Sequence, residues 1–269
     1  MYQKNITPLI QSLLLATVLA SGLIASACSA ESSSISVLSN QSTPTEIYEL
    51  ELAYYEGNSV PEDDDKAFEL FKEAATQGYA PAQHHIGIMY HEGIGVDQDY
   101  RKAFEWVQLA AIQGYSHAQT DLAIIYESGK GIDQNYEKAM KWYLLSANNI
   151  DPSSASIDAQ NNIGNLYENG YGVTQSYTKA LDWYRKAAAQ DLDLAQLNIG
   201  GLYENGYGVP QDYDEAFEWY KKSADQGNQE ASNRIGRLVM NGKTDDKDIV
   251  IYSTQETGLT LGDIEEMSQ

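Results

Sequence analysis

The chain has 269 residues and a formal net charge of −22 at pH 7, with a sequence pI of about 4.3. An acidic surface of this kind repels nucleic acid and anionic lipid headgroups, so we expect neither as a partner. Its single cysteine, Cys28, excludes intramolecular disulfides, so the fold must be stabilised by packing alone.

The first 27 residues have the features of a secretory signal peptide. A short polar start with one cation, Lys4, leads into a mostly apolar run over residues 9–24, and small residues precede Cys28. Charged flanks on both sides, which are typical of a helix that stops in a membrane, are missing. We therefore expect residues 1–27 to be removed from the mature protein.

The end of this segment resembles a bacterial lipobox. In Ala25-Ser26-Ala27-Cys28 the cysteine stands where lipoproteins are lipidated, although such boxes usually carry leucine where Ala25 stands. The alternatives are ordinary cleavage after Ala27 and trimming after Ala30. The resemblance implies an outer-membrane lipoprotein that faces the periplasm and is held by its lipid alone; a soluble periplasmic or secreted protein is the alternative.

Two further segments lie outside the repeated part of the chain. Residues 28–45 are rich in Ser, Thr, Asn and Gln, and we expect them to form the lipidated N-terminus and a flexible linker. Residues 243–269 form a non-repeat tail, in which we expect residues 249–252 to form a short strand or to cover the end of the repeats.

Five copies of one 36-residue sequence repeat occupy most of the chain. Residues 159–173 and 195–209 are nearly identical, and the four tryptophans recur at one position of the repeat. An insertion at residues 151–155 lengthens the third copy, and we expect it to form a surface bulge. The five copies and a partial sixth are residues 46–81, 82–117, 118–158, 159–194, 195–230 and 231–242.

Each copy predicts two helices, a leading one and a trailing one, joined by a loop that has two glycines in the second to fifth copies. The leading helix carries apolar residues at helical spacing, as at Ala195, Ile199 and Leu202. A small residue follows the first aliphatic one, which indicates a close approach of two helices, since glycine otherwise weakens a helix. In successive copies this small residue is Gly87, Ala123, Gly164, Gly200 and Gly236.

The trailing helix begins at a residue that can cap it and buries a face that includes the tryptophan of each copy. It ends at a glycine in the first, second and fifth copies, whereas the third and fourth have Ile150 and Asp191 at that phase. The candidate N-caps are Asp63, Asp99, Asn135, Ser176 and Asp212.

The combined pattern A-x-x-x-[IL]-[GA]-x-x-Y-x-x-G-x-G resembles the Sel1-like repeat, a relative of the tetratricopeptide repeat. The resemblance covers residues 46–242. It implies an all-α protein, a right-handed α-solenoid of stacked antiparallel helix pairs with a concave face. Stacking is also expected on physical grounds, because one helix pair cannot bury its apolar stripe alone.

No group of residues predicts catalysis or metal binding. The histidines that lie close together are adjacent or seven residues apart, which is not the i, i+4 spacing of a ligand pair, so we expect surface histidines. The acidic run at residues 62–65 lacks the spacing and the glycine of a calcium loop. We therefore expect no catalytic residue, no metal and no cofactor. The four histidines are His84, His85, His91 and His117.

Three positions of the leading helix, spaced four apart, lie on one face and differ freely between copies. Such variation fits either plain exposure to solvent or a face adapted to a partner, and apolar residues at these positions favour the second. We expect a protein partner to bind here. The candidate binding residues are Tyr48, Leu52, His84, Ile88, Thr120, Ile124, Asn161, Asn165, Leu197 and Asn198.

The resemblance implies a non-enzymatic scaffold or adaptor for protein–protein interaction in the bacterial envelope. One alternative is a periplasmic immunity protein that inhibits a phospholipase effector of type VI secretion, a role in which exported Sel1-like lipoproteins occur. An alternative of another class is a hydrolase acting on β-lactams or cell-wall precursors, but the chain lacks the paired cysteines of the relatives proposed to do so.

Overall fold

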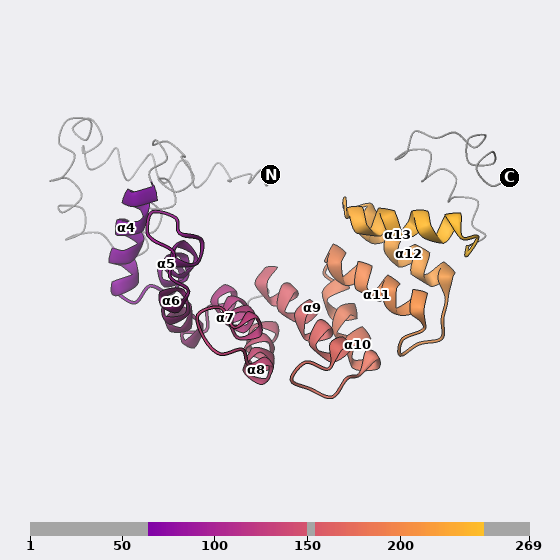
Figure 1. Cartoon of the computed structure of the whole chain (residues 1–269), viewed down its shortest axis with the longest axis horizontal. Coiled ribbons are helices and arrows are strands. Elements are labelled where there is room, and N and C mark those ends of the chain that lie inside the picture. Colours follow the sequence, from indigo (N-terminus) through magenta and orange to yellow (C-terminus); the bar gives the residue numbers. More distant parts are fainter. Residues whose placement is uncertain (1–63, 150–153, 245–269) are drawn as a thin grey trace.

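The computed structural model describes residues 64–149 and 154–244, and every regular element within them is an α-helix (Figure 1). None of these helices is long and apolar enough to cross a membrane. The helices are α4 (Asp64–Thr76), α5 (Ala80–Glu92), α6 (Tyr100–Ile112), α7 (Ser116–Ser128), α8 (Tyr136–Ala147), α9 (Ser154–Asn169), α10 (Tyr177–Ala188), α11 (Asp193–Asn205), α12 (Tyr213–Ala224) and α13 (Gln229–Met240).

Several predicted features lie outside the described residues. They are the signal peptide, Cys28, the linker, the leading helix of the first copy with Tyr48 and Leu52, the N-cap Asp63, and the tail from residue 245.

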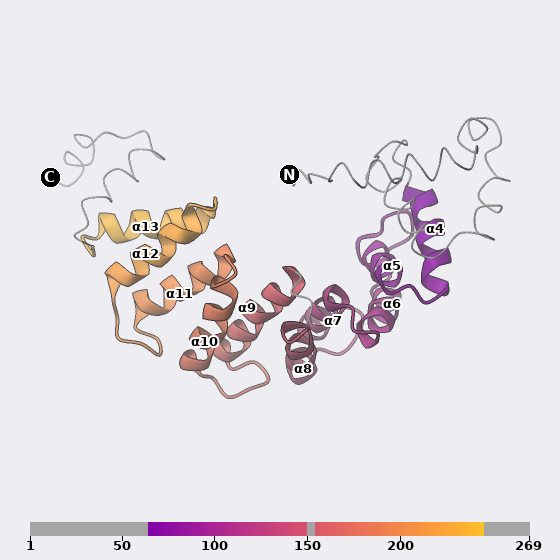
Figure 2. The same ribbon diagram turned by 180° about the vertical axis from the view of Figure 1, so that it is seen from behind.

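The helices stack as pairs along an arc. The leading helices of the second to fifth copies are α5, α7, α9 and α11, each followed by its trailing helix, while α4 is the trailing helix of the first copy and α13 the leading helix of the sixth. Helices α7 and α9 lie toward the inside of the arc, and α8 and α10 lie on its outside (Figures 1 and 2). We call these two surfaces the inner face and the outer face. The expected all-α solenoid is therefore confirmed.

The helix ends follow the predicted local chemistry. The Asp99 carboxylate accepts hydrogen bonds from the backbone N–H groups of Lys102 and Arg101, and the first of these bonds lowers the pKa of Asp99. Asn135, Ser176 and Asp212 cap their helices in the same way. The first loop glycine of the second to fifth copies has φ between 70° and 77°, the left-handed conformation that ends the leading helix.

The small residue of the leading helix allows the close approach that the sequence predicted. A Cβ atom on Gly200 would lie 2.6 Å from the ring of Tyr220, and one on Gly164 would overlap the ring of Tyr184. At Gly87 the neighbour is Val107. At Gly236 a Cβ atom would meet no described atom, because α13 has no described trailing helix beside it.

The second loop glycine joins neighbouring copies, a role that the sequence did not predict. A Cβ atom on Gly172 would lie 2.7 Å from Tyr136, the first residue of the trailing helix in the preceding copy. Gly208 meets Tyr177 at 2.8 Å in the same way. The loop of each copy therefore packs on the start of the preceding trailing helix, and only glycine is small enough for this contact.

The tryptophans are not the core residues that we expected. The fully buried aromatic residue is the next one along the trailing helix, namely Tyr143, Tyr184 or Tyr220, each at most 1% exposed. Trp183 is only partly buried, and the Lys186 ammonium lies 3.5 Å from its ring centroid. The tryptophan thus lies at the edge of the packed interface, where a lysine covers its outer side.

The insertion in the third copy differs in part from the expected surface bulge. Ser154 and Ala155 belong to α9 and lengthen it to 16 residues, while residues 150–153 lie outside the described part of the chain. Ala155 is 6% exposed, and its carbonyl accepts a hydrogen bond of 2.9 Å from the Thr120 hydroxyl. The end of the insertion is therefore packed against the third copy.

Candidate protein-binding surface

The predicted binding residues divide into an accessible and a buried group. Ile124 is 44% exposed, and the side chains that are partly exposed are Ile88, Asn165, Leu197 and Asn198. His84, Thr120 and Asn161 are at most 6% exposed. The expectation that all of these positions form an exposed face is wrong for the last three.

The three buried side chains are occupied by hydrogen bonds to the next leading helix. His84 Nε2 lies 2.7 Å from the Asp121 carboxylate, and the Asn161 side-chain oxygen accepts from Asn198 at 3.0 Å. Thr120 bonds the carbonyl of Ala155. Each of these bonds joins a different pair of residue types. The residue at this position of the repeat therefore differs from copy to copy although it is buried in these three. Variation at this position of the repeat therefore reflects the different hydrogen-bond partner in each copy and not exposure to solvent.

The histidines also differ from the surface placement that we expected. The ring of His84 is buried and lies 5.4 Å from the ring of Tyr115 and 6.2 Å from that of His117, measured between centroids. Burial raises the pKa of the nearby Asp158 carboxyl, assisted by Asp121 and opposed by His117. Within residues 64–149 and 154–244, no three metal-ligating side chains are placed to hold an ion.

Three tyrosine–carboxylate pairs recur along the leading helices. The buried Tyr143 hydroxyl donates to Glu127 at 2.7 Å, and Tyr184 donates to Glu168 at 2.5 Å. The fifth copy has the same pair, with 16 residues between the partners in each case. Burial and the adjacent carboxylate raise the pKa of each of these hydroxyls, so the tyrosines remain protonated donors. These pairs lie at the C-terminal end of each leading helix.

Charge is segregated between the two kinds of helix. The leading helices α5, α7, α9 and α11 contain no lysine or arginine, although each carries aspartate or glutamate. The trailing helices α6, α8, α10 and α12 each carry two or more basic residues. The leading helices therefore give the inner face a negative charge that their own residues do not neutralise.

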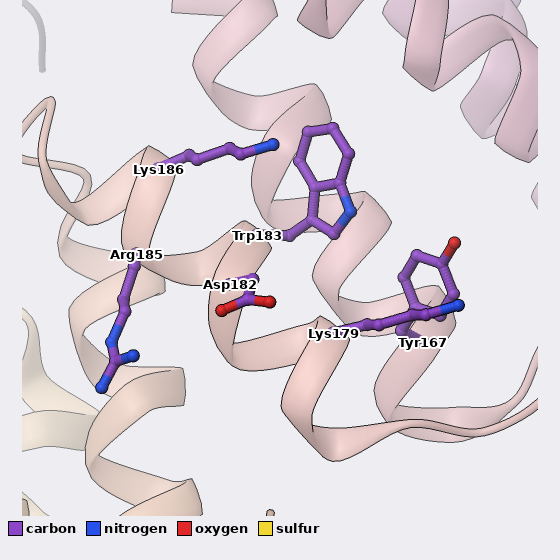
Figure 3. A pocket seen from close by; sticks show the side chains of 6 residues that line it. All are labelled: Tyr167, Lys179, Asp182, Trp183, Arg185 and Lys186. Carbon is purple, nitrogen blue, oxygen red and sulfur yellow. The ribbon is translucent and has the colours of Figure 1, made fainter.

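The outer face has a shallow groove of about 550 Å³ on α9 and α10, which sequence reasoning missed. Figure 3 shows Lys186 extended toward the indole of Trp183, while Arg185 points away. Arg185 donates to the Tyr203 hydroxyl of the next copy at 3.2 Å, and Lys179 lies 5.2 Å from the ring centroid of Tyr167. The basic groups of this groove are thus already in contact with aromatic groups of the chain itself.

The model of one protein family, described as the Sel1 repeat, matches five segments of the chain. The matched residues are 49–79, 80–115, 116–151, 157–192 and 193–228, which is more than half of the sequence. The chain belongs to the Sel1 repeat family. No curated protein matches it in sequence.

Two solved structures of Sel1 repeat proteins resemble the chain throughout the repeats. The Oxalobacter formigenes Sel1 repeat protein is 27% identical, with a TM-score of 0.72, over 84% of this chain and 89% of its own length. The protective antigen c5321 of uropathogenic Escherichia coli is 32% identical, with a TM-score of 0.70, over 80% of this chain. The match spans 46% of c5321, about half of that longer chain.

The immunity protein Pa5087 of Pseudomonas aeruginosa is a more distant match. It is 20% identical, with a TM-score of 0.47, over 70% of this chain and 68% of its own length, a degree of likeness that carries no argument about function. Membership of the Sel1 repeat family accounts for the solenoid of stacked helix pairs. This arrangement has two surfaces, and the leading helices α5, α7, α9 and α11 of the inner face contain no lysine or arginine.

Proposed function

We propose that the chain is a non-enzymatic scaffold of the bacterial cell envelope that holds a partner protein on its inner face. The observation that carries the proposal is the inner face itself, where Ile124 is 44% exposed on α7, a leading helix that also carries Asp121 and Glu127 and no lysine or arginine. An apolar centre with a polar surround is typical of protein–protein interfaces.

The polar groups of the leading helices support binding rather than chemistry. His84 bonds Asp121, Thr120 bonds Ala155 and Asn161 bonds Asn198, in each case from one leading helix to the next. Each of these side chains serves the stacking of the solenoid. The accessible residues of these helices include Ile88, Ile124 and Leu197 beside amides and glutamates, which suit recognition of a protein surface.

Capture of a partner by the tagged full chain, solubilised in mild detergent, tests the proposal. We expect a specific protein from the envelope fraction of the source cells to be retained. The double variant Ile88→Asp with Ile124→Asp should lose it, because charge at the centre of an interface typically costs 2 kcal/mol or more, on the order of 30-fold in affinity. A phospholipase among the captured proteins would give the immunity role its support.

The matched control is Leu109→Asp with Leu145→Asp. These leucines are 48% and 53% exposed on the trailing helices α6 and α8 of the same two copies, so the change in charge is the same. Capture should survive this control, and the circular dichroism melt should stay within a few degrees of the parent for both variants. Loss of capture only in the control would place the partner on the outer face and refute the proposal.

A further inference from the structure

Arg234 of α13 shows how the inner face holds a guanidinium group. Its Nη1 atom lies 3.4 Å from Oε2 of Glu204 in the preceding copy, and its Nε atom donates to Glu230 at 2.7 Å. The same Glu204 oxygen accepts from the buried Tyr220 hydroxyl at 2.5 Å. The two ion-paired side chains, Arg234 and Glu204, are only 34% and 22% exposed. Glu204 is thus held by a tyrosine on one side and by an arginine on the other.

The third and fourth copies repeat this arrangement without the arginine. Glu127 and Glu168 each accept from the buried tyrosine of their own copy, as Glu204 does. The repeat places Asn162 and Asn198 at the position of Arg234. Asn162 lies within hydrogen-bonding reach of Tyr143, as Arg234 does of Tyr220, so the equivalent positions also agree in space. Two glutamates therefore stand in the same setting as Glu204 but beside an uncharged amide.

Neither of these two glutamates forms an ion pair with a described residue. The ion pairs formed by described residues include Glu204 and do not include Glu127 or Glu168. The helices on both sides, α7, α9 and α11, contain no lysine or arginine. These leading helices therefore do not supply the guanidinium group that Arg234 provides beside Glu204.

We propose that Glu127 and Glu168 are receptor sites for two arginine side chains of the partner, which binds the inner face through an arginine-bearing segment. This inference rests on the proposed function and adds the chemistry by which the partner protein is recognised. Arginine fits better than lysine because each site offers several acceptor oxygens. Beside Glu168, the Asn165 oxygen also faces the site and already accepts from Tyr184 at 2.7 Å. The planar guanidinium can donate to two or more oxygens at once.

The repeat also sets the spacing of the two arginines. Neighbouring packed helices are about 8–10 Å apart, so equivalent sites on adjacent leading helices are separated by roughly that distance. In polyproline II conformation a chain rises about 3.1 Å per residue with three residues per turn, so two arginines three residues apart lie on one side of the segment and span the two sites. An Arg-x-x-Arg segment in polyproline II conformation is therefore the form of partner that this surface fits.

A fluorescent peptide of four Arg-Ser-Gly units, mixed with the detergent-solubilised full chain at low salt, tests this inference. Binding should weaken at least ~10-fold when Glu127→Gln and Glu168→Gln are combined, equivalent to about 1.4 kcal/mol. Glutamine can still accept from tyrosine, so the fold should be retained. The matched control is Glu105→Gln with Glu218→Gln, two exposed glutamates of trailing helices. Its effect should stay below about 2-fold, and the same peptide with citrulline in place of arginine should not bind.

Two further variants exchange arginines within the chain itself. Asn198→Arg should place a guanidinium beside Glu168 as Arg234 lies beside Glu204, and so weaken peptide binding while the circular dichroism spectrum shows that the fold is retained. Arg234→Asn should free Glu204 as a third site and strengthen binding. Three results would each overturn the inference. They are an equal loss of peptide affinity in the Glu127→Gln, Glu168→Gln variant and in its control, equal binding of the citrulline peptide, and unchanged peptide binding by Asn198→Arg.

Capture of the protein partner separates this inference from the proposed function. If a partner is captured, and the Glu127→Gln, Glu168→Gln variant retains it while Ile88→Asp with Ile124→Asp loses it, the scaffold stands and the arginine sites are wrong. If the peptide binds as expected but no partner is captured, the chemistry of the sites stands and the proposed function fails.

Discussion

Asp191 is the one described residue other than glycine whose φ is positive, at 62°. It follows α10 at the phase where the first, second and fifth copies have a glycine, and φ at those glycines is 90° to 92°. A side chain in the left-handed region crowds the backbone and costs about 1–2 kcal/mol. Asp191 therefore carries local strain that the other copies avoid.

Replacing Asp191 with glycine should stabilise the protein. The strain is relieved, but glycine also gains freedom in the unfolded chain, so the net gain should be about 0.5–1 kcal/mol. Urea unfolding followed by circular dichroism measures it. As a control, Ala189→Gly two residues earlier, where φ is −67°, should destabilise by about 0.5–1 kcal/mol. A loss of stability in both variants would contradict the assignment of strain.

At the scale of single residues, sequence reasoning succeeded where the cause is local. The N-caps Asp99 and Asp212 were predicted because a cap bonds the backbone two or three residues on. The bonds of His84 to Asp121 and of Asn198 to Asn161 were not, since their partners lie 37 residues apart in the chain. Such pairs become visible only when the copies are stacked.

At the scale of the helix pair, one small residue sets how closely the leading and trailing helices approach. Gly164 and Gly200 each face a fully buried tyrosine ring, while Gly236 of α13 faces no described atom. The same residue at the same phase thus has opposite consequences for stability. In the stacked copies it is required for packing, and in the last one it only weakens the helix.

The pair Gly200→Ala and Gly236→Ala separates these two consequences. In Gly200→Ala the new methyl group overlaps the Tyr220 ring, and displacing that ring should cost about 1–3 kcal/mol. In Gly236→Ala the methyl group meets no described atom, and alanine should stabilise the helix by about 1 kcal/mol. Thermal melts of both variants beside the parent provide the measurement. A destabilised Gly236→Ala would indicate that another part of the protein covers this end of α13.

The packing of one helix against its neighbour also explains why the tryptophans were wrongly predicted to be core residues. Trp183 and Tyr184 are adjacent on α10, so their side chains point about 100° apart, and both are large and aromatic. Periodicity showed that one face of the helix is buried but did not separate the centre of that face from its edge. The deciding feature is Gly164 on the neighbouring helix, which leaves room for Tyr184 alone.

At the scale of the whole molecule, sequence and structure agree on a solenoid, because the period of the repeat and the need to bury each apolar stripe leave few other arrangements. The candidate site was predictable only in part. Sequence pointed to the leading helices, and Ile124 is indeed exposed there. The recurring tyrosine–glutamate pairs were missed, because their 16-residue spacing joins two helices whose relative rotation the sequence does not specify.

The proposed envelope location depends on Cys28 and is tested on the full chain in cells. Metabolic labelling with a palmitate analogue should tag the parent protein and not the Cys28→Ser variant, because a thioether needs the cysteine sulfur. The variant should then move from the membrane to the soluble fraction, since several acyl chains anchor a protein far more firmly than its acidic surface could. An unlabelled variant that stays in the membrane would refute the lipid anchor.

The bonds between copies also fix the order in which the copies can follow one another. A duplicate of residues 159–194, inserted directly after the original, would place a second Asn162 opposite Asn161, the amide pairing that Asn198 now provides. A duplicate of residues 82–117 would instead place a second His85 opposite His84, where Asp121 is now. The solenoid can therefore be lengthened in its C-terminal half by simple duplication, whereas its N-terminal half accepts a new copy only with a matching change in its neighbour.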